Sequence, residues 1–155
     1  MPSYFLSLFT RWVHMLSMAA LLGGALLMWW LAGGWQPWES EEEGRLLLFG
    51  ARRYEWLFWI SIGLLTLTGI GNLGAFGSDL PAGGSGWGIR FVVKLFLVLI
   101  LIAFSLFRSL FVGGLWHNQN RIEPSGIVKV ARALYAATTL LALAILLLAV
   151  FLAHG

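Results

Sequence analysis

The residues with the clearest chemical potential are an imidazole and a thioether that lie one helical turn apart. His14 and Met18 are four positions apart in an apolar segment, so a helix there places both on one face. Arg11, three positions before His14, shares that face. An imidazole nitrogen together with a thioether sulfur suits copper, above all Cu(I). The same imidazole is also the usual axial ligand of haem iron, with a methionine or a second histidine opposite.

Other polar groups lie near the same predicted depth. Thr68 and Asn72 lie toward the outer end of the second apolar segment, Lys94 toward that of the third, and His154 closes the fourth. Ionisable groups inside a span are costly, so each marks a functional candidate. The outer half of the predicted bundle is therefore the expected position of any site.

Two sets of site residues follow from this convergence. The predicted metal ligands are His14, Met18 and His154. The predicted cofactor-binding residues, in which cations pair with haem propionates or another anionic group, are His14, Lys94, Arg11 and Arg90. The bound group is haem b or copper, and the residues leave that choice open because imidazole serves both.

Each candidate also has a structural interpretation. Lys94 and Arg90 can extend to the interface, and His154 can be a solvated terminus. Met18 can simply pack, and His14 can hydrogen-bond across the bundle. The sequence contains no Ser/His/Asp set and no paired intramembrane carboxylate, so no catalytic residue is predicted and an enzyme is not favoured. Glu55 is expected to mark the cytoplasmic interface together with Arg52.

These groups require membrane-spanning helices to position them. The chain has 155 residues, of which 59% are apolar and only 11% charged, and a soluble domain of this size needs more charge on its surface. Runs of about 20 apolar residues suit spanning helices. The sequence predicts one all-α membrane domain, residues 1–155, with four transmembrane helices at about 6–32, 54–76, 91–115 and 130–153.

The polar connections indicate helix limits and orientation. Ser40 and Glu43 form a capping-box pattern, which predicts that the second helix begins near Glu41. Lys and Arg favour the cytoplasmic side of a span. One side holds seven of them (Arg45, Arg52, Arg53, Arg108, Arg121, Lys129, Arg132) and the other three (Arg11, Arg90, Lys94). The prediction is N-out/C-out in a bacterial inner membrane. Basic residues that flank apolar runs give no reason to expect nucleic acid.

Several short motifs resemble the copper-resistance D (CopD) domain. The stretch Arg11-Trp-Val-His14, followed by Gly23-Gly24, is similar to the first helix of that family. Arg52-Arg53 leading to Leu67-Thr68-Gly69 is similar to its second helix, and Trp87-Gly88 through Lys94 to its third. The resemblance implies copper handling across the inner membrane.

The chain is also similar to HemJ-type proteins, four-helix membrane proteins that carry b-type haem. A first-helix histidine and a third-helix lysine matter in that group, and His14 and Lys94 match them. The group has an arginine late in its first helix, where this chain reads Leu26-Leu27-Met28-Trp29-Trp30. The resemblance therefore implies haem binding without protoporphyrinogen oxidation.

Two functions of different classes follow. The first is an electron-transfer or copper-handling protein whose partners are the lipid bilayer and a periplasmic redox or copper protein. The second is a structural subunit of a larger respiratory or photosynthetic membrane complex, without a cofactor of its own, because short loops and many tryptophans suit burial against other subunits.

Overall fold

Four long helices make up the computed structural model, which describes residues 2–33, 41–74, 86–118 and 124–154. They are α1 (Pro2–Ala32), α2 (Glu41–Gly74), α3 (Gly86–His117) and α4 (Pro124–His154). The predicted all-helical class is confirmed over these residues, which contain no strand. The expected start of the second helix at Glu41 is confirmed as well.

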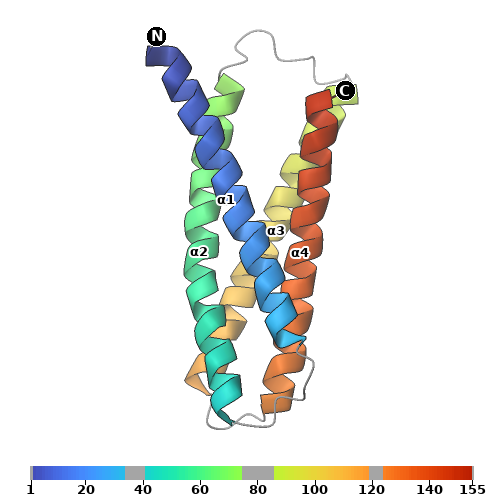
Figure 1. Ribbon diagram of the computed structural model, residues 1–155. Helices are drawn as coiled ribbons and strands as arrows, with labels where there is room; N and C mark the ends of the chain where they lie inside the picture. Colours follow the sequence, from blue (N-terminus) through green and yellow to red (C-terminus); the bar gives the residue numbers. More distant parts are fainter. Residues whose placement is uncertain (1, 34–40, 75–85, 119–123, 155) are drawn as a thin grey trace.

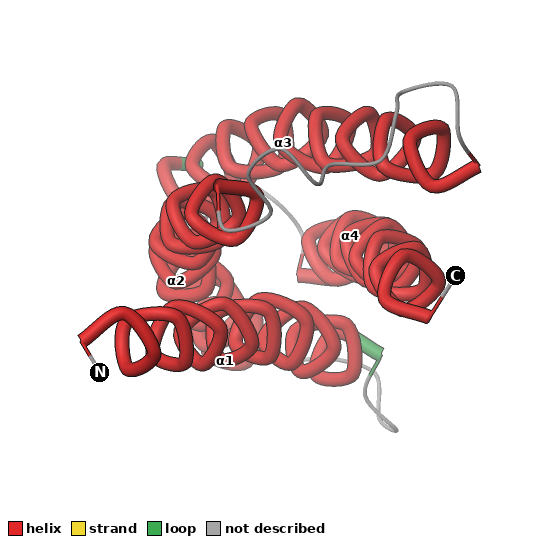
Figure 2. Tube along the Cα trace, turned by 90° about the horizontal axis from the view of Figure 1, so that it is seen from above, coloured by secondary structure: helices red, strands yellow, loops and turns green. Residues whose placement is uncertain are grey.

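The helices run alternately up and down, so both chain termini lie at one end of the bundle (Figure 1). We call this the terminal end. The opposite end, the charged end, carries Glu42, Glu43, Arg45, Arg52, Arg53, Lys129 and Arg132. Helix α1 packs most extensively on α2 and then on α4, whereas α3 packs mainly on α4 (Figure 2).

Three helices are long and apolar enough to cross a membrane by length and composition. The qualifying stretches among the described residues are Tyr4–Ala32, Gly86–His117 and Gly126–Leu152. Helix α2 is equally long, but its first half carries the acidic and basic residues of the charged end. It nevertheless packs against all three others within the bundle. The chain is therefore a multi-pass membrane protein.

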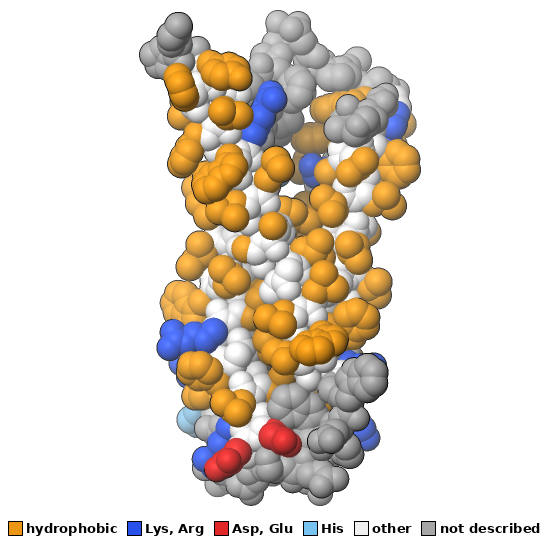
Figure 3. All heavy atoms as spheres, viewed as in Figure 1, with side chains coloured by type: hydrophobic (Ala, Val, Ile, Leu, Met, Phe, Trp, Pro, Cys, Tyr) orange, Lys and Arg blue, Asp and Glu red, His pale blue; other side chains and the backbone are white. Residues whose placement is uncertain are grey.

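The core follows the helical repeat. Buried apolar side chains recur every three or four residues, as a helix with one inward face requires. They include Leu21, Ala25, Met28 and Ala32 on α1, and Leu47, Ala51, Tyr54 and Phe58 on α2. Large apolar side chains also cover much of the outer surface (Figure 3). In lipid such a surface carries no hydrophobic penalty, so the buried face alone positions the helices.

One contact brings α1 and α2 unusually close. A Cβ built on Gly24 would lie 2.5 and 2.6 Å from two ring carbons of Tyr54. The ring cannot easily retreat, because Tyr54 is 4% exposed and its hydroxyl donates to the Leu21 carbonyl oxygen at 2.9 Å. Only glycine permits this approach, whereas the neighbouring Gly23 faces open space.

Helices α1 and α3 extend further at the terminal end than the apolar runs predicted. Helix α1 begins at Pro2 rather than near residue 6, and α3 begins at Gly86 rather than near 91. Each extension adds about one turn at ~3.6 residues per turn. His14 and Lys94 consequently lie about one turn further from the ends of their helices than the predicted bounds placed them.

Replacing Gly24 by alanine tests the close approach. We expect Gly24→Ala to lower the free energy of unfolding by about 1–3 kcal/mol, because a Cβ overpacks the Tyr54 ring. The matched Gly23→Ala should be neutral or stabilising, since alanine has the better helix propensity. Thermal unfolding in detergent measures both variants. Equal stabilities would contradict this packing.

Candidate functional site

The predicted site contains a hydrogen bond between its histidine and the second helix. His14 is half-buried on α1, and its Nδ1 lies 2.8 Å from Thr68 Oγ1 on α2. Thr68 itself is buried, at 9% exposure. The two polar groups that the sequence placed at one depth on different helices are therefore in direct contact.

This contact fixes which ring nitrogen is available. Thr68 Oγ1 lies 2.6 Å from the Leu64 carbonyl oxygen, which can only accept a hydrogen bond, so the hydroxyl proton points there. Toward His14 the threonine oxygen must then accept, and Nδ1 must carry the proton. Nε2 of the neutral ring keeps its lone pair. A partner that sets the tautomer in this way is typical of metal-ligating histidines.

The other described candidates are Met18 and Arg11 on α1 and Lys94 on α3. Met18 is half-buried and packs against the main core one turn further along α1. Lys94 of α3 is half-buried and close enough for its charge to act on His14. Arg11 is exposed on the same helix. The structure thus joins an imidazole on α1 to a threonine hydroxyl on α2, with an ammonium group on α3 within electrostatic range.

Of the three remaining candidates, Arg90 binds the end of α4, and the side chains of the other two are not described. Arg90 Nε donates to the Gly86 carbonyl at 3.0 Å, and its Nη1 lies 3.5 Å from the Phe151 carbonyl. Trp87 Nε1 donates to the Leu152 carbonyl at 3.2 Å, so both side chains bind the last turns of α4. The side chains of His154 and Asn72 lie outside the described residues, and their predicted roles stay predictions.

The donor set at the terminal end is sparse. Among the residues whose side chains are described, no three His, Cys, Asp or Glu residues group together. The space-filling view shows the surface hollowed at this end, between α1 and α4, with a basic side chain inside the hollow (Figure 3). One imidazole nitrogen, one thioether and nearby cations can hold a soft ion weakly or one face of a larger anionic group.

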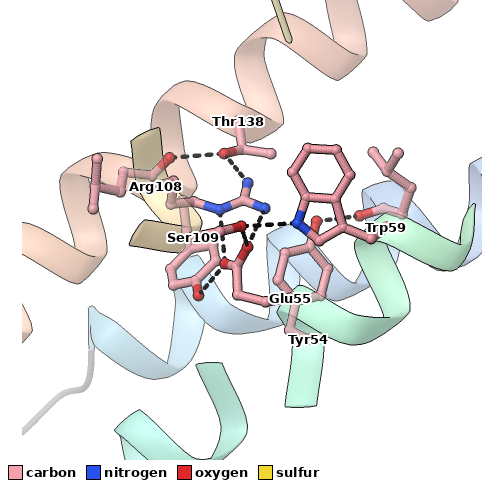
Figure 4. Close-up of polar contacts among 9 residues, drawn as sticks. Tyr54, Glu55, Trp59, Arg108, Ser109 and Thr138 are labelled. Atoms are coloured by element: carbon pink, nitrogen blue, oxygen red, sulfur yellow. Dashed lines mark hydrogen bonds and ion pairs between the residues drawn. The ribbon is translucent and has the colours of Figure 1, made fainter. Parts of the chain in front are cut away.

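A second polar cluster, nearer the charged end, is more extensive. Arg108 of α3 is fully buried, and Glu55 of α2 is 8% exposed. The guanidinium donates from Nε to Glu55 Oε1 at 2.8 Å and from Nη2 to Oε2 at 3.0 Å, a bidentate ion pair (Figure 4). This geometry is the strongest that a guanidinium and a carboxylate form.

Side chains from three helices complete the pair. Tyr135 of α4 donates to Oε1 at 3.1 Å, and Ser109 of α3 donates to Oε2 at 2.5 Å. Trp59 in turn donates to Ser109, at 2.9 Å, and Thr138 accepts from Arg108 Nη1 at 2.5 Å (Figure 4). We call this set of residues the ion-pair cluster.

The cluster is closed rather than open to a ligand. Four donors reach the two Glu55 oxygens, which fills the lone-pair positions of a carboxylate. Three rings flank the guanidinium, with Phe58 nearest at 4.5 Å and Tyr54 and Tyr135 at 5.3 Å. Such contacts stabilise a desolvated cation. The arrangement therefore joins helices and leaves the carboxylate no room for a metal.

The expected role of Glu55 was wrong. Glu55 pairs with Arg108 inside the bundle, whereas Arg52 is exposed and lies over the Trp116 ring at 5.1 Å. Glu55 therefore belongs to a buried ion pair between α2 and α3 rather than to an interface with Arg52. Arg108 had been counted with the basic residues of the charged end. Its position well before the end of α3 at His117 was the signal for a buried role.

Breaking the ion pair tests its contribution. We expect Glu55→Ala to lower the free energy of unfolding by about 3–5 kcal/mol, because it leaves a buried guanidinium without its counter-charge. The double variant Glu55→Leu/Arg108→Met should recover much of this loss, since it removes both charges. Arg53→Ala, an exposed change on α2, is the control. Unfolding in mixed detergents would contradict the pairing if Glu55→Ala matched Arg53→Ala.

The comparison with known families covers the larger part of the chain. A family model described as Copper resistance protein D matches residues 50–152. No curated protein and no solved structure matches the chain. The matched region contains the whole ion-pair cluster, Thr68 and Lys94. It does not include α1, the helix that carries His14 and Met18. Because it spans more than half of the sequence, the chain belongs to the copper resistance protein D family.

Proposed function

We propose that this membrane protein handles copper as Cu(I), with His14 Nε2 and the Met18 sulfur as its ligands. The observation that carries the proposal is the 2.8 Å hydrogen bond between His14 Nδ1 and Thr68 Oγ1. It leaves Nε2 as the free ligand atom and holds the ring on the face shared with Met18. Membership of the copper resistance protein D family supports copper as the substrate.

The chemistry of the site favours the monovalent ion. Cu(I) accepts soft, low-coordinate donor sets such as imidazole with thioether, whereas divalent ions prefer more donors and carboxylates. The ammonium of Lys94 acts on the same space and repels a divalent cation about twice as strongly as a monovalent one. Two neutral donors beside a cation suit transient binding of an ion in transit.

Haem b is the second candidate, supported by the hollow between α1 and α4 at the terminal end. The residues fit this group in part, because His14 Nε2 can be an axial ligand and Arg11 and Lys94 can bind propionates. A bound haem would supply one-electron redox chemistry. The similarity to HemJ-type proteins belongs with this candidate and stays a prediction.

Metal binding by the purified full-length protein tests the site. We expect His14→Ala to abolish Cu(I) binding and Met18→Leu to weaken it, because each removes one of the two donor atoms. Thr68→Val should weaken binding about 10–100-fold through loss of ring orientation. Copper content after loading under reducing conditions gives occupancy, and an absorption spectrum reports haem through its Soret band.

Matched controls lie beside each ligand. Met15→Leu removes a thioether that is exposed on the surface of α1, and His117→Ala removes an exposed imidazole at the charged end. Both should bind copper normally. Occupancy that survives His14→Ala would refute the site. Absence of both copper and a Soret band from the unaltered protein would instead favour the structural-subunit function.

We further propose that the terminal end faces the periplasm of a bacterial inner membrane, where a periplasmic copper or redox protein is the partner. The chain has no cysteine, so single introduced thiols report topology directly. An impermeant maleimide should label Gly86→Cys in intact cells and leave Asn118→Cys unlabelled until the cells are opened. These residues lie at opposite ends of α3. The reverse pattern would invert the orientation.

A further inference from the structure

A pocket near the charged end joins the last turn of α1 to the third turn of α4. It is lined by Trp29, Trp30, Gly33 and Arg132. Trp30 is 66% exposed and Trp29 is 40% exposed, so the indoles border the pocket from the outer surface of the bundle. Indole rings near the end of a span are typical of the depth of the lipid headgroups.

Arg132 needs a partner at this position. It lies within the apolar stretch Gly126–Leu152 and is exposed on the outer surface of α4. Over the described parts of the chain, neither a hydrogen bond nor an ion pair engages its guanidinium. A cation at the edge of the hydrocarbon region is stabilised by an anionic partner such as phosphate, which guanidinium binds through two parallel hydrogen bonds.

The other wall of the pocket has the opposite polarity. A Cβ on Gly33 would lie 3.3 Å from the Trp29 carbonyl oxygen, 3.4 Å from that of Trp30 and 3.6 Å from Arg132 Nε. These carbonyls belong to the C-terminal end of α1, which carries partial negative charge. The missing side chain of Gly33 therefore leaves a space between a cation and carbonyl acceptors.

We propose that this pocket binds the headgroup of a zwitterionic phospholipid, specifically phosphoethanolamine. Its phosphate pairs with Arg132, and its ammonium donates to the carbonyl oxygens beside Gly33 and contacts the indole faces of Trp29 and Trp30. The phosphate of an anionic headgroup without an amine can also pair with Arg132, but it leaves the carbonyl oxygens at the negative helix end without a cationic donor. A choline headgroup carries the positive charge but has no N–H to donate.

This lipid site is independent of the proposed copper site, because it is formed by different residues at the other end of the bundle. Native mass spectrometry of the full-length protein in detergent, with equal amounts of phosphatidylethanolamine, phosphatidylcholine or phosphatidylglycerol added, measures the preference. We expect phosphatidylethanolamine to be retained most. Arg132→Gln should reduce its retention about tenfold, the effect of losing a charge-assisted hydrogen bond.

Two further variants keep the assignment falsifiable. Arg53→Gln removes an exposed arginine that lies over Phe49 on α2 and should leave lipid retention unchanged. Gly33→Ala fills the space between the carbonyls and the guanidinium without changing charge, and it should also lower retention. Equal losses in Arg132→Gln and Arg53→Gln, or retention of phosphatidylglycerol above phosphatidylethanolamine, would overturn the proposal. Inorganic phosphate that displaces the lipid completely would overturn the headgroup assignment in favour of an anion site.

Discussion

The structure depends on a charge pair that a bilayer would otherwise exclude. Arg108 and Glu55 lie on different helices, and neither is tolerable alone in a low-dielectric core. Together, with tyrosine, serine and threonine partners, they satisfy each other's hydrogen-bonding capacity. Apolar helices gain no net hydrophobic energy by leaving lipid for one another. A directional polar contact therefore has more influence on the arrangement of this bundle than the same contact would have in water.

The cluster also reaches α1, the one helix that contributes no residue to it. Tyr54 faces the guanidinium with its ring and donates its hydroxyl to the Leu21 carbonyl of α1. The absence of a side chain at Gly24 lets that ring approach α1. Tyr54 therefore contacts both α1 and the ion pair, and it helps to fix the rotation of α1 about its own axis. His14 and Met18 lie on α1, so the direction in which their side chains point depends partly on this contact in the other half of the bundle.

The sequence predicted the features that depend on local pattern. Four apolar runs indicated the helices, the Ser40 and Glu43 pattern located the start of α2, and the first run placed His14 and Met18 on one helix. It did not predict the Glu55–Arg108 pair, because these residues are 53 positions apart and only tertiary packing joins them. The preference of Lys and Arg for the cytoplasmic side does not distinguish buried from exposed residues. It therefore placed Arg108 among the exposed arginines of the charged end. The extensions of α1 and α3 at the terminal end were not predicted either. Gly, Ser and Tyr near these ends weaken the apolar pattern but do not stop a helix.

The bond from Tyr54 to Leu21 has a genetic consequence. Under the proposed function, a screen for loss of copper tolerance would recover changes at Glu55, Arg108 and Gly24 as well as changes at His14, although the first three lie away from the proposed ligands. Phenotype alone would then not distinguish the proposed ligands from residues that only stabilise the fold. The amount of folded protein in the membrane separates the two groups, because ligand variants leave it intact and cluster variants deplete it.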